Sequence, residues 1–160
     1  MKQRFIATLV AMALGMTTYV SFGSGRLFGD IGQRDDITSL YIGKTLLRLV
    51  GSSVTGSLPG VDIEDIADSL DSIEIVTGDS VKAKKFLAAQ TASIIGKLQG
   101  LEEALVNDDG DDKTYIYVQS DPADPDIISR LLIIQEEEDE YQIISMTGKI
   151  PVSVLEDLSD

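Results

Sequence analysis

The sequence Ser129–Gln135 (SRLLIIQ) and the sequence Tyr141–Thr147 (YQIISMT) are two apolar runs separated by five acidic residues. Each run has the length of a β-strand, and in the first one Leu131 and Ile133 share a face. The acidic residues between them, Glu136–Glu140, are typical of a solvated hairpin connection. The two runs therefore predict an antiparallel hairpin in the last third of the chain.

Three further stretches predict strands on the same reasoning. Thr114–Gln119 alternates between tyrosines and aliphatic residues. Ile37–Ile42 places Leu40 and Ile42 on one face, and Ser72–Thr77 places Ile73 and Ile75 on one face. The two prolines of residues 121–126 make that stretch a loop between strands. Because the later strands follow one another with short connections, we expect an antiparallel meander.

Helical periodicity fills most of the remaining chain. Short helices are predicted at 43–50, from Asp62 to Leu70, and after Pro151. One long helix is predicted from Ser80 to Val106, capped by Asp79 or Ser80 and followed by a turn to residue 112. Its apolar stripe is Leu87, Ile94, Leu98, Leu101 and Leu105. We expect an α+β domain of two layers, with a mostly antiparallel sheet and with the long helix and the short helices packed on one face.

The tyrosines of the predicted strands allow two interpretations. If Tyr115, Tyr117 and Tyr141 face away from the helices, they form an aromatic contact surface on an open sheet face. Otherwise they are ordinary cross-strand neighbours. In the same region, Gly148 is expected to end the last strand.

The first residues predict export. Lys2 and Arg4 precede an apolar run of about a dozen residues, and small residues follow, which is the pattern of a signal peptide. We expect residues 1–23 to be this signal, cleaved after Gly23 or alternatively after Gly25, and an uncleaved anchor is the competing interpretation. The chain has no cysteine, so it carries neither a lipoprotein anchor nor a disulfide.

The mature chain is expected to consist of a flexible leader, residues 24–35, and a single domain, residues 36–160. Removal of Lys2 and Arg4 reduces the 13 basic residues to 11, against 27 acidic ones, so the formal charge becomes −16 instead of −14. Such a charge disfavours binding to nucleic acid or to an anionic lipid surface. No later segment of the sequence is long and apolar enough to span a bilayer.

The composition excludes several catalytic mechanisms. Without histidine and cysteine, the chain has no Ser-His-Asp triad, no cysteine nucleophile and no zinc site built on these residues. Carboxylate chemistry remains open, and Asp71 with Glu74 is the least trivial acidic pair. A Ser39–Lys44 pair has no supporting motif. We assign no catalytic or cofactor-binding residue.

Two acidic runs invite a cation-binding hypothesis. Asn107–Asp112 contains four aspartates and a glycine, but it lacks the ligand spacing of an EF-hand loop. A helix end followed by a turn explains this run, and a solvated hairpin tip explains Glu136–Glu140. We therefore assign no metal ligand.

Three segments resemble one protein family, the domain-of-unknown-function family 4252. They are Ile37–Val50, Leu70–Val76 (LDSIEIV) and Ile143–Leu158, so the resemblance spans most of residues 35–158. It implies an exported protein of Gram-negative bacteria, mainly Bacteroidota, and it implies no established activity, substrate or cofactor. Many family members carry a lipoprotein cysteine, which this chain lacks, so membrane attachment does not carry over.

These observations predict an exported, periplasmic or secreted, non-enzymatic domain that binds another envelope protein or the cell envelope itself. A carboxylate-dependent hydrolase using Asp71 and Glu74 is the first alternative. A domain that binds divalent cations weakly is the second alternative. No cofactor is expected.

Overall fold

The computed structural model describes residues 26–29, 31, 34–54 and 66–159. The expected signal peptide lies outside this part of the chain, as do residues 62–65 of the helix expected from Asp62 to Leu70. The described part of that segment contains only a short 3-10 helix, residues 67–69, and Leu70 already belongs to a strand. In chain order, the described elements are β1 (Ile37–Gly43), α2 (Lys44–Val54), the 3-10 helix η2 (Ala67–Ser69), β2 (Leu70–Gly78), α4 (Val81–Lys97), β3 (Leu101–Asp109), β4 (Asp112–Ser120), β5 (Ile127–Glu136), β6 (Tyr141–Pro151) and α5 (Val154–Ser159).

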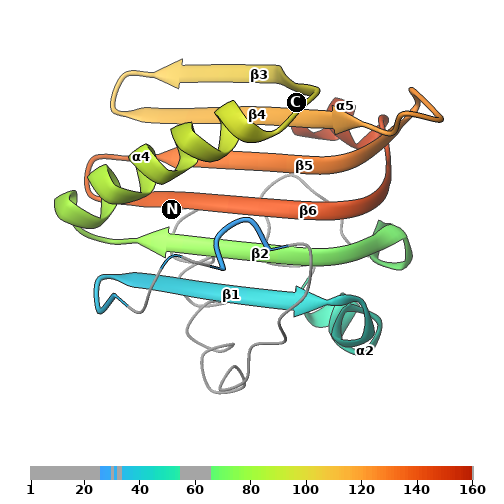
Figure 1. The fold of residues 1–160 in the computed structure, drawn as a ribbon, viewed down its shortest axis with the longest axis horizontal. Helices are drawn as coiled ribbons and strands as arrows, with labels where there is room; N and C mark the ends of the chain where they lie inside the picture. The colour runs from blue at the N-terminus through green and yellow to red at the C-terminus, as the bar shows by residue number, and fades with distance from the viewer. Residues whose placement is uncertain (1–25, 30, 32–33, 55–65, 160) are drawn as a thin grey trace.

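The six strands form one antiparallel sheet in the order β1-β2-β6-β5-β4-β3 (Figure 1). Strands β3 to β6 follow one another as a meander. Strand β2 pairs with β6 on the side away from β5, and β1 pairs with β2 and forms one edge of the sheet. The predicted hairpin is present, and its register places Ile133 opposite Ile144. The prediction of an α+β fold with a mostly antiparallel sheet is confirmed.

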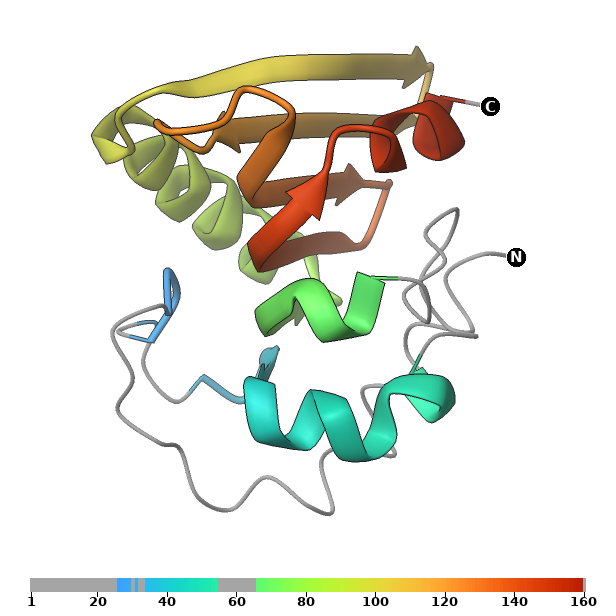
Figure 2. The same cartoon turned by 90° about the vertical axis from the view of Figure 1, so that its right-hand side faces the viewer.

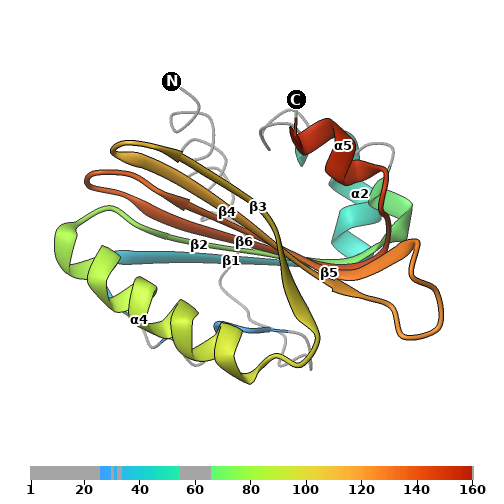
Figure 3. The same ribbon diagram turned by 90° about the horizontal axis from the view of Figure 1, so that it is seen from above.

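The sheet buries apolar side chains on both faces, which corrects the expectation that all helices lie on one face. Figure 3 shows α4 on one side of the sheet and α2 and α5 on the other. Figure 2 shows α2 and α5 apart from each other, at opposite margins of their face. Leu47 of α2 and Val154 of α5 pack with Ile75 and Met146, whereas Leu87 of α4 packs with Ile143. Because strand side chains alternate, an apolar run such as that of β5 supplies both cores.

The long helix ends earlier than predicted, and its expected last part is a strand. Helix α4 stops at Lys97, and Gly100, with φ of +73°, turns the chain into β3. Leu101 and Leu105 belong to this strand and reach opposite faces of the sheet. The pairing of eight β3 residues with β4 outweighs a helical spacing that only two leucines support in this stretch. The predicted cap is confirmed, since the Ser80 hydroxyl accepts the Ala83 N–H at 3.1 Å.

Strand β6 continues through Gly148 to Pro151, although Gly148 was expected to end it. Gly148 has a φ of +152°, and a Cβ at this position would collide with the backbone oxygen of Ser69 and approach Leu70 Cα to 2.9 Å. The glycine therefore permits β6 to pass close to the backbone at the start of β2. Pro151 ends the strand, and α5 begins three residues later.

The three tyrosines do not form a patch on a helix-free face. Tyr141 is buried in the α4-side core, and Tyr115 and Tyr117 pack against it. Among the described residues, no helix is both long enough and apolar enough to cross a membrane.

Candidate functional site

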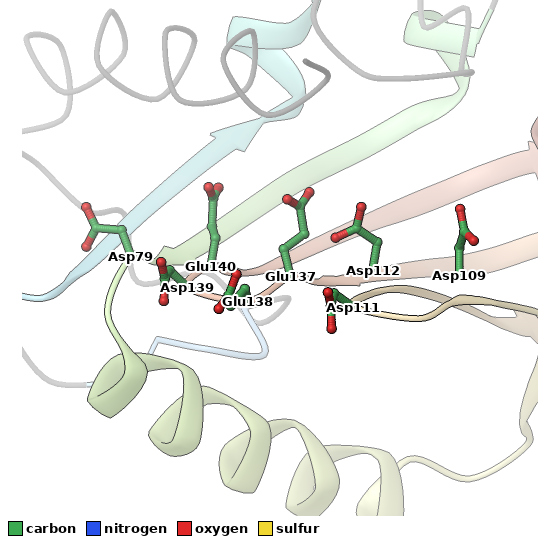
Figure 4. A pocket seen from close by; sticks show the side chains of 8 residues that line it. All are labelled: Asp79, Asp109, Asp111, Asp112, Glu137, Glu138, Asp139 and Glu140. Atoms are coloured by element: carbon green, nitrogen blue, oxygen red, sulfur yellow. The ribbon is translucent and has the colours of Figure 1, made fainter.

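The two acidic runs, Asn107–Asp112 and Glu136–Glu140, meet at one pocket. The β3–β4 turn, the β5–β6 turn and the junction between β2 and α4 all lie at the same end of the sheet (Figure 4). Together they line an open, shallow pocket of about 510 Å³. Eight acidic residues line it: Asp79, Asp109, Asp111, Asp112, Glu137, Glu138, Asp139 and Glu140.

Tight turns place these carboxylates. In the β3–β4 hairpin Asp109 pairs with Asp112, and Gly110, with φ of +70°, makes the two-residue turn between them. In the β5–β6 hairpin the Glu137 N–H donates to the Glu140 carbonyl at 2.8 Å. The acidic run was expected to be a turn over residues 107–112, but most of it is strand and only its centre turns.

The pocket is electrostatically one-sided. Burial, followed by the Asp112 charge, raises the pKa of Glu137, and burial together with Glu137 and Asp79 raises the pKa of Glu140. No cationic side chain is among the residues that line it. Two lysines lie close by. Lys84 forms an ion pair with Glu136 at 3.2 Å and donates to the backbone carbonyl of Glu137 at 2.7 Å, and Lys113 forms an ion pair with Asp108 at 3.7 Å.

The carboxylates of the pocket do not converge on one point. Figure 4 shows them pointing in several directions from the three segments. Within the described residues no group of three or more acidic side chains has the arrangement of a metal site. The pocket therefore offers a diffuse negative charge rather than a coordination shell.

The predicted acidic pair, Asp71 and Glu74, is separated by its surroundings. Asp71 is exposed and its carboxylate lies 3.2 Å from the Lys44 ammonium. The Ser39 hydroxyl is buried without a hydrogen-bond partner within the described structure, so it forms no hydrogen bond with Lys44. Glu74 is only 2% exposed. The two carboxylates thus have different partners and form no acid–base couple.

Glu74 is the centre of a second polar site, which the sequence analysis missed. Its carboxylate accepts the backbone N–H groups of Leu27 at 2.8 Å and Phe28 at 3.0 Å. The Arg26 Nε lies 3.9 Å from the same carboxylate, and the guanidinium lies over the Tyr41 ring at 5.3 Å. Burial raises the pKa of Glu74, against the effect of the two N–H groups, Arg26 and Arg130.

The residues that contact Glu74 belong to the stretch expected to be a flexible leader. Phe28 is 2% exposed and packs in the α4-side core. Further along, Arg34 lies 4.4 Å from the centre of the Phe86 ring of α4 and forms an ion pair with Asp36 at 2.9 Å. Two features of the sequence are consistent with this contact. Apolar residues such as Leu27 and Phe28 lie among the glycines of the leader, and Glu74 lies at a β2 position that strand alternation assigns to a buried face.

Arg130 of β5 completes this polar site. Its Nη1 donates to the Ser145 hydroxyl at 3.1 Å, and Ser145 is the direct cross-strand neighbour of Glu74. The Arg130 Nε is buried and has no hydrogen-bond partner in the described part of the chain. Burial lowers the pKa of Arg130, and the charge of Glu74 opposes this effect.

The comparisons with known proteins identify the family. The model of a domain of unknown function, DUF4252, matches residues 30–158, so the chain belongs to this family and the predicted resemblance is confirmed. No curated protein matches the chain. A crystal structure of a protein of unknown function, PA94 from Pseudomonas aeruginosa, is 13% identical and covers 81% of this chain and 78% of its own, with a TM-score of 0.34. A likeness of this degree supports no argument about function.

Proposed function

We propose that this member of a family of unknown function is an exported, non-enzymatic binding domain that recognises a basic segment of another envelope protein at the acidic pocket. The observation that carries the proposal is the pocket itself: a concave surface of about 510 Å³ whose eight lining residues are all acidic. A concave surface of one charge attracts and orients partners of the opposite charge.

Export is part of the proposal. The basic start, the apolar run and the small residues up to Gly23 support a cleaved signal peptide. The absence of cysteine supports a product without a lipid anchor. In this proposal the protein acts in the periplasm or outside the cell.

Repulsion within the pocket favours a cationic partner. Two like charges at ~4 Å repel by about 1 kcal/mol in bulk water, and by more near a protein surface. Such repulsion acts on Glu137 and Glu140, because the charges of neighbouring carboxylates help to raise the pKa of each. A bound ammonium or guanidinium group would relieve it, and the interaction would weaken as salt increases.

Binding fits the site better than hydrolysis does. A carboxylate hydrolase needs one protonated and one ionised acid on either side of a substrate. Among the described residues the carboxylate of Glu74 is buried, and it binds the backbone of residues 27 and 28. Asp71 is exposed and pairs with Lys44 instead. Six of the eight pocket residues are exposed and the other two, Glu137 and Glu140, are partly buried, so the pocket presents accessible charge that suits recognition of a cationic partner.

The test is binding of a fluorescent hexalysine peptide to the purified exported protein. The pocket variant E138Q/D139N/E140Q is compared with D68N/E102Q/D126N, which removes the same charge from exposed acids outside the pocket. Three exposed ion pairs of roughly 0.5 kcal/mol each predict about tenfold weaker binding for the pocket variant. We expect little change for the control variant, and weaker binding of the unmodified protein at high salt.

Equal weakening in both variants would show that net charge alone attracts the peptide, and would refute the pocket as the binding site. The same preparation answers the cation hypothesis. If millimolar calcium raises the Tm at constant ionic strength and displaces hexalysine, the pocket is a cation site and the proposal of a basic protein partner is overturned.

A further inference from the structure

Residues 26–29, the strap, lie on the same side of the sheet as α4. In Figure 1 this segment passes in front of β2, and Figure 3 places it on the α4 side. Phe28 is 2% exposed and packs in the same core as Val76, Leu87 and Ile143. The strap therefore covers part of the sheet face beside the helix.

A single carboxylate anchors the strap. Glu74 accepts two consecutive backbone N–H groups, those of Leu27 and Phe28, from residues 46 and 47 positions earlier in the chain. Hydrogen bonds to an ionised acceptor are stronger than those between neutral groups. The anchor is independent of the side chains of residues 27 and 28, since it uses only their backbone.

Two guanidinium groups act on the same carboxylate, and the Nε of each is buried without a hydrogen-bond partner within the described residues. Arg26 arrives with the strap and lies 3.9 Å from Glu74. Arg130 belongs to the sheet and reaches Ser145, the cross-strand neighbour of Glu74, while its buried Nε has no partner within the described residues. Around Glu74 stand Arg26 from the strap, Tyr41 on β1, Ser145 on β6 and Arg130 on β5.

We propose that the strap is a two-state latch, docked when Glu74 binds its backbone N–H groups and open when Glu74 pairs with Arg130 instead. In the docked state the Arg130 Nε is left without a partner. In the open state Arg130 replaces the lost N–H donors, so release of the strap does not leave a buried carboxylate without a partner. Opening also uncovers the apolar seat of Phe28 on the α4 side, apart from the acidic pocket.

Hydrogen exchange of the Leu27 and Phe28 amides in the purified exported protein measures the latch. Exchange is read by NMR relative to a core amide such as that of Ile75, so that a global loss of stability cancels. R130M removes the competing partner, and we expect the two strap amides to exchange about fivefold more slowly. E74Q removes the charged acceptor, and we expect exchange at least about tenfold faster. D71N, a change to an exposed acid on the same strand, is the control and leaves both rates unchanged.

The combined variant separates a latch from simple packing. If Arg130 acts by competing for Glu74, R130M has no effect on the strap amides once E74Q is present. Faster or unchanged exchange in R130M alone overturns the proposal, because Arg130 would then support the docked strap or play no part in it. Should E74Q not fold, R130K provides a second measurement, since it keeps the charge, can still pair with Glu74 and should leave exchange close to that of the unmodified protein.

Discussion

Replacement of Phe28 by alanine tests whether the strap is a structural part of the domain. Phe28 is 2% exposed and lies among Val76, Leu87 and Ile143. Truncation of a buried phenylalanine to alanine costs about 3–5 kcal/mol, through lost burial and the cavity left behind. The strap can also detach, which limits the loss to its docking free energy, so we expect a loss at the lower end, about 3 kcal/mol.

The free energy of unfolding of F28A is measured by urea denaturation. Unfolding is followed by circular dichroism, because the chain has no tryptophan for fluorescence detection. A loss of about 3 kcal/mol lowers the Tm of a domain of this size by roughly 10 °C. L49A is the matched control, since Leu49 of α2 is 77% exposed and its truncation should change stability by less than about 0.5 kcal/mol. If F28A is as stable as L49A, the strap contributes nothing and the reasoning from its contacts fails.

Two glycines and the pH dependence give further predictions. Gly148→Ala should destabilise the protein by more than about 2 kcal/mol, because the new Cβ meets the backbone of residues 69 and 70 at a φ of +152°. Gly96→Ala should stabilise it by up to about 1 kcal/mol, since Gly96 lies in α4 with nothing within 4 Å of a new Cβ; urea midpoints with opposite signs for the two variants would support both. Burial raises the pKa of Glu74 above its unfolded value of 4.5, so the folded protein binds the proton more tightly than the unfolded chain does. The contribution of Glu74 to stability is therefore greatest below pH 4.5 and falls as the pH rises through the folded pKa. Urea midpoints should therefore decline as the pH rises above 4.5, less steeply in E74Q, and equal slopes in the two proteins would rule out a contribution from Glu74.

The sequence predicts strands β5 and β6 well because two independent signals support them. The β5–β6 hairpin combines two apolar runs with an acidic connection, and the two agree on one register. Strand β3 lacks such agreement. Its leucines at 101 and 105 fit the helical spacing of the preceding stripe, whereas its acidic residues fit an exposed edge strand. Pairing with β4 decides between the two, and pairing is a property of distant residues that the local pattern does not contain.

The candidate site was predictable in its parts but not in its assembly. Both acidic runs were recognised as turns, yet their meeting depends on the strand order, which places the two hairpins and the start of α4 at one end of the sheet. The strap was missed for a similar reason. The contact that holds it joins the Phe28 N–H to the Glu74 carboxylate, 46 residues apart in the chain. Every non-proline residue has a backbone N–H, so the sequence alone does not indicate this hydrogen bond.

Glu74 is costly for stability, and this cost argues for a role. Its neighbours along β2, Ile73 and Ile75, are completely buried, and an apolar side chain at position 74 would avoid the desolvation of a carboxylate. Buried ionic groups are often replaceable by apolar residues without loss of stability, so stability alone does not account for a charge here. An apolar residue would, however, leave the N–H groups of Leu27 and Phe28 without an acceptor and Arg26 and Arg130 without a counter-charge. The carboxylate thus specifies where the strap docks, in the way that a polar group inside a core selects one arrangement over the alternatives.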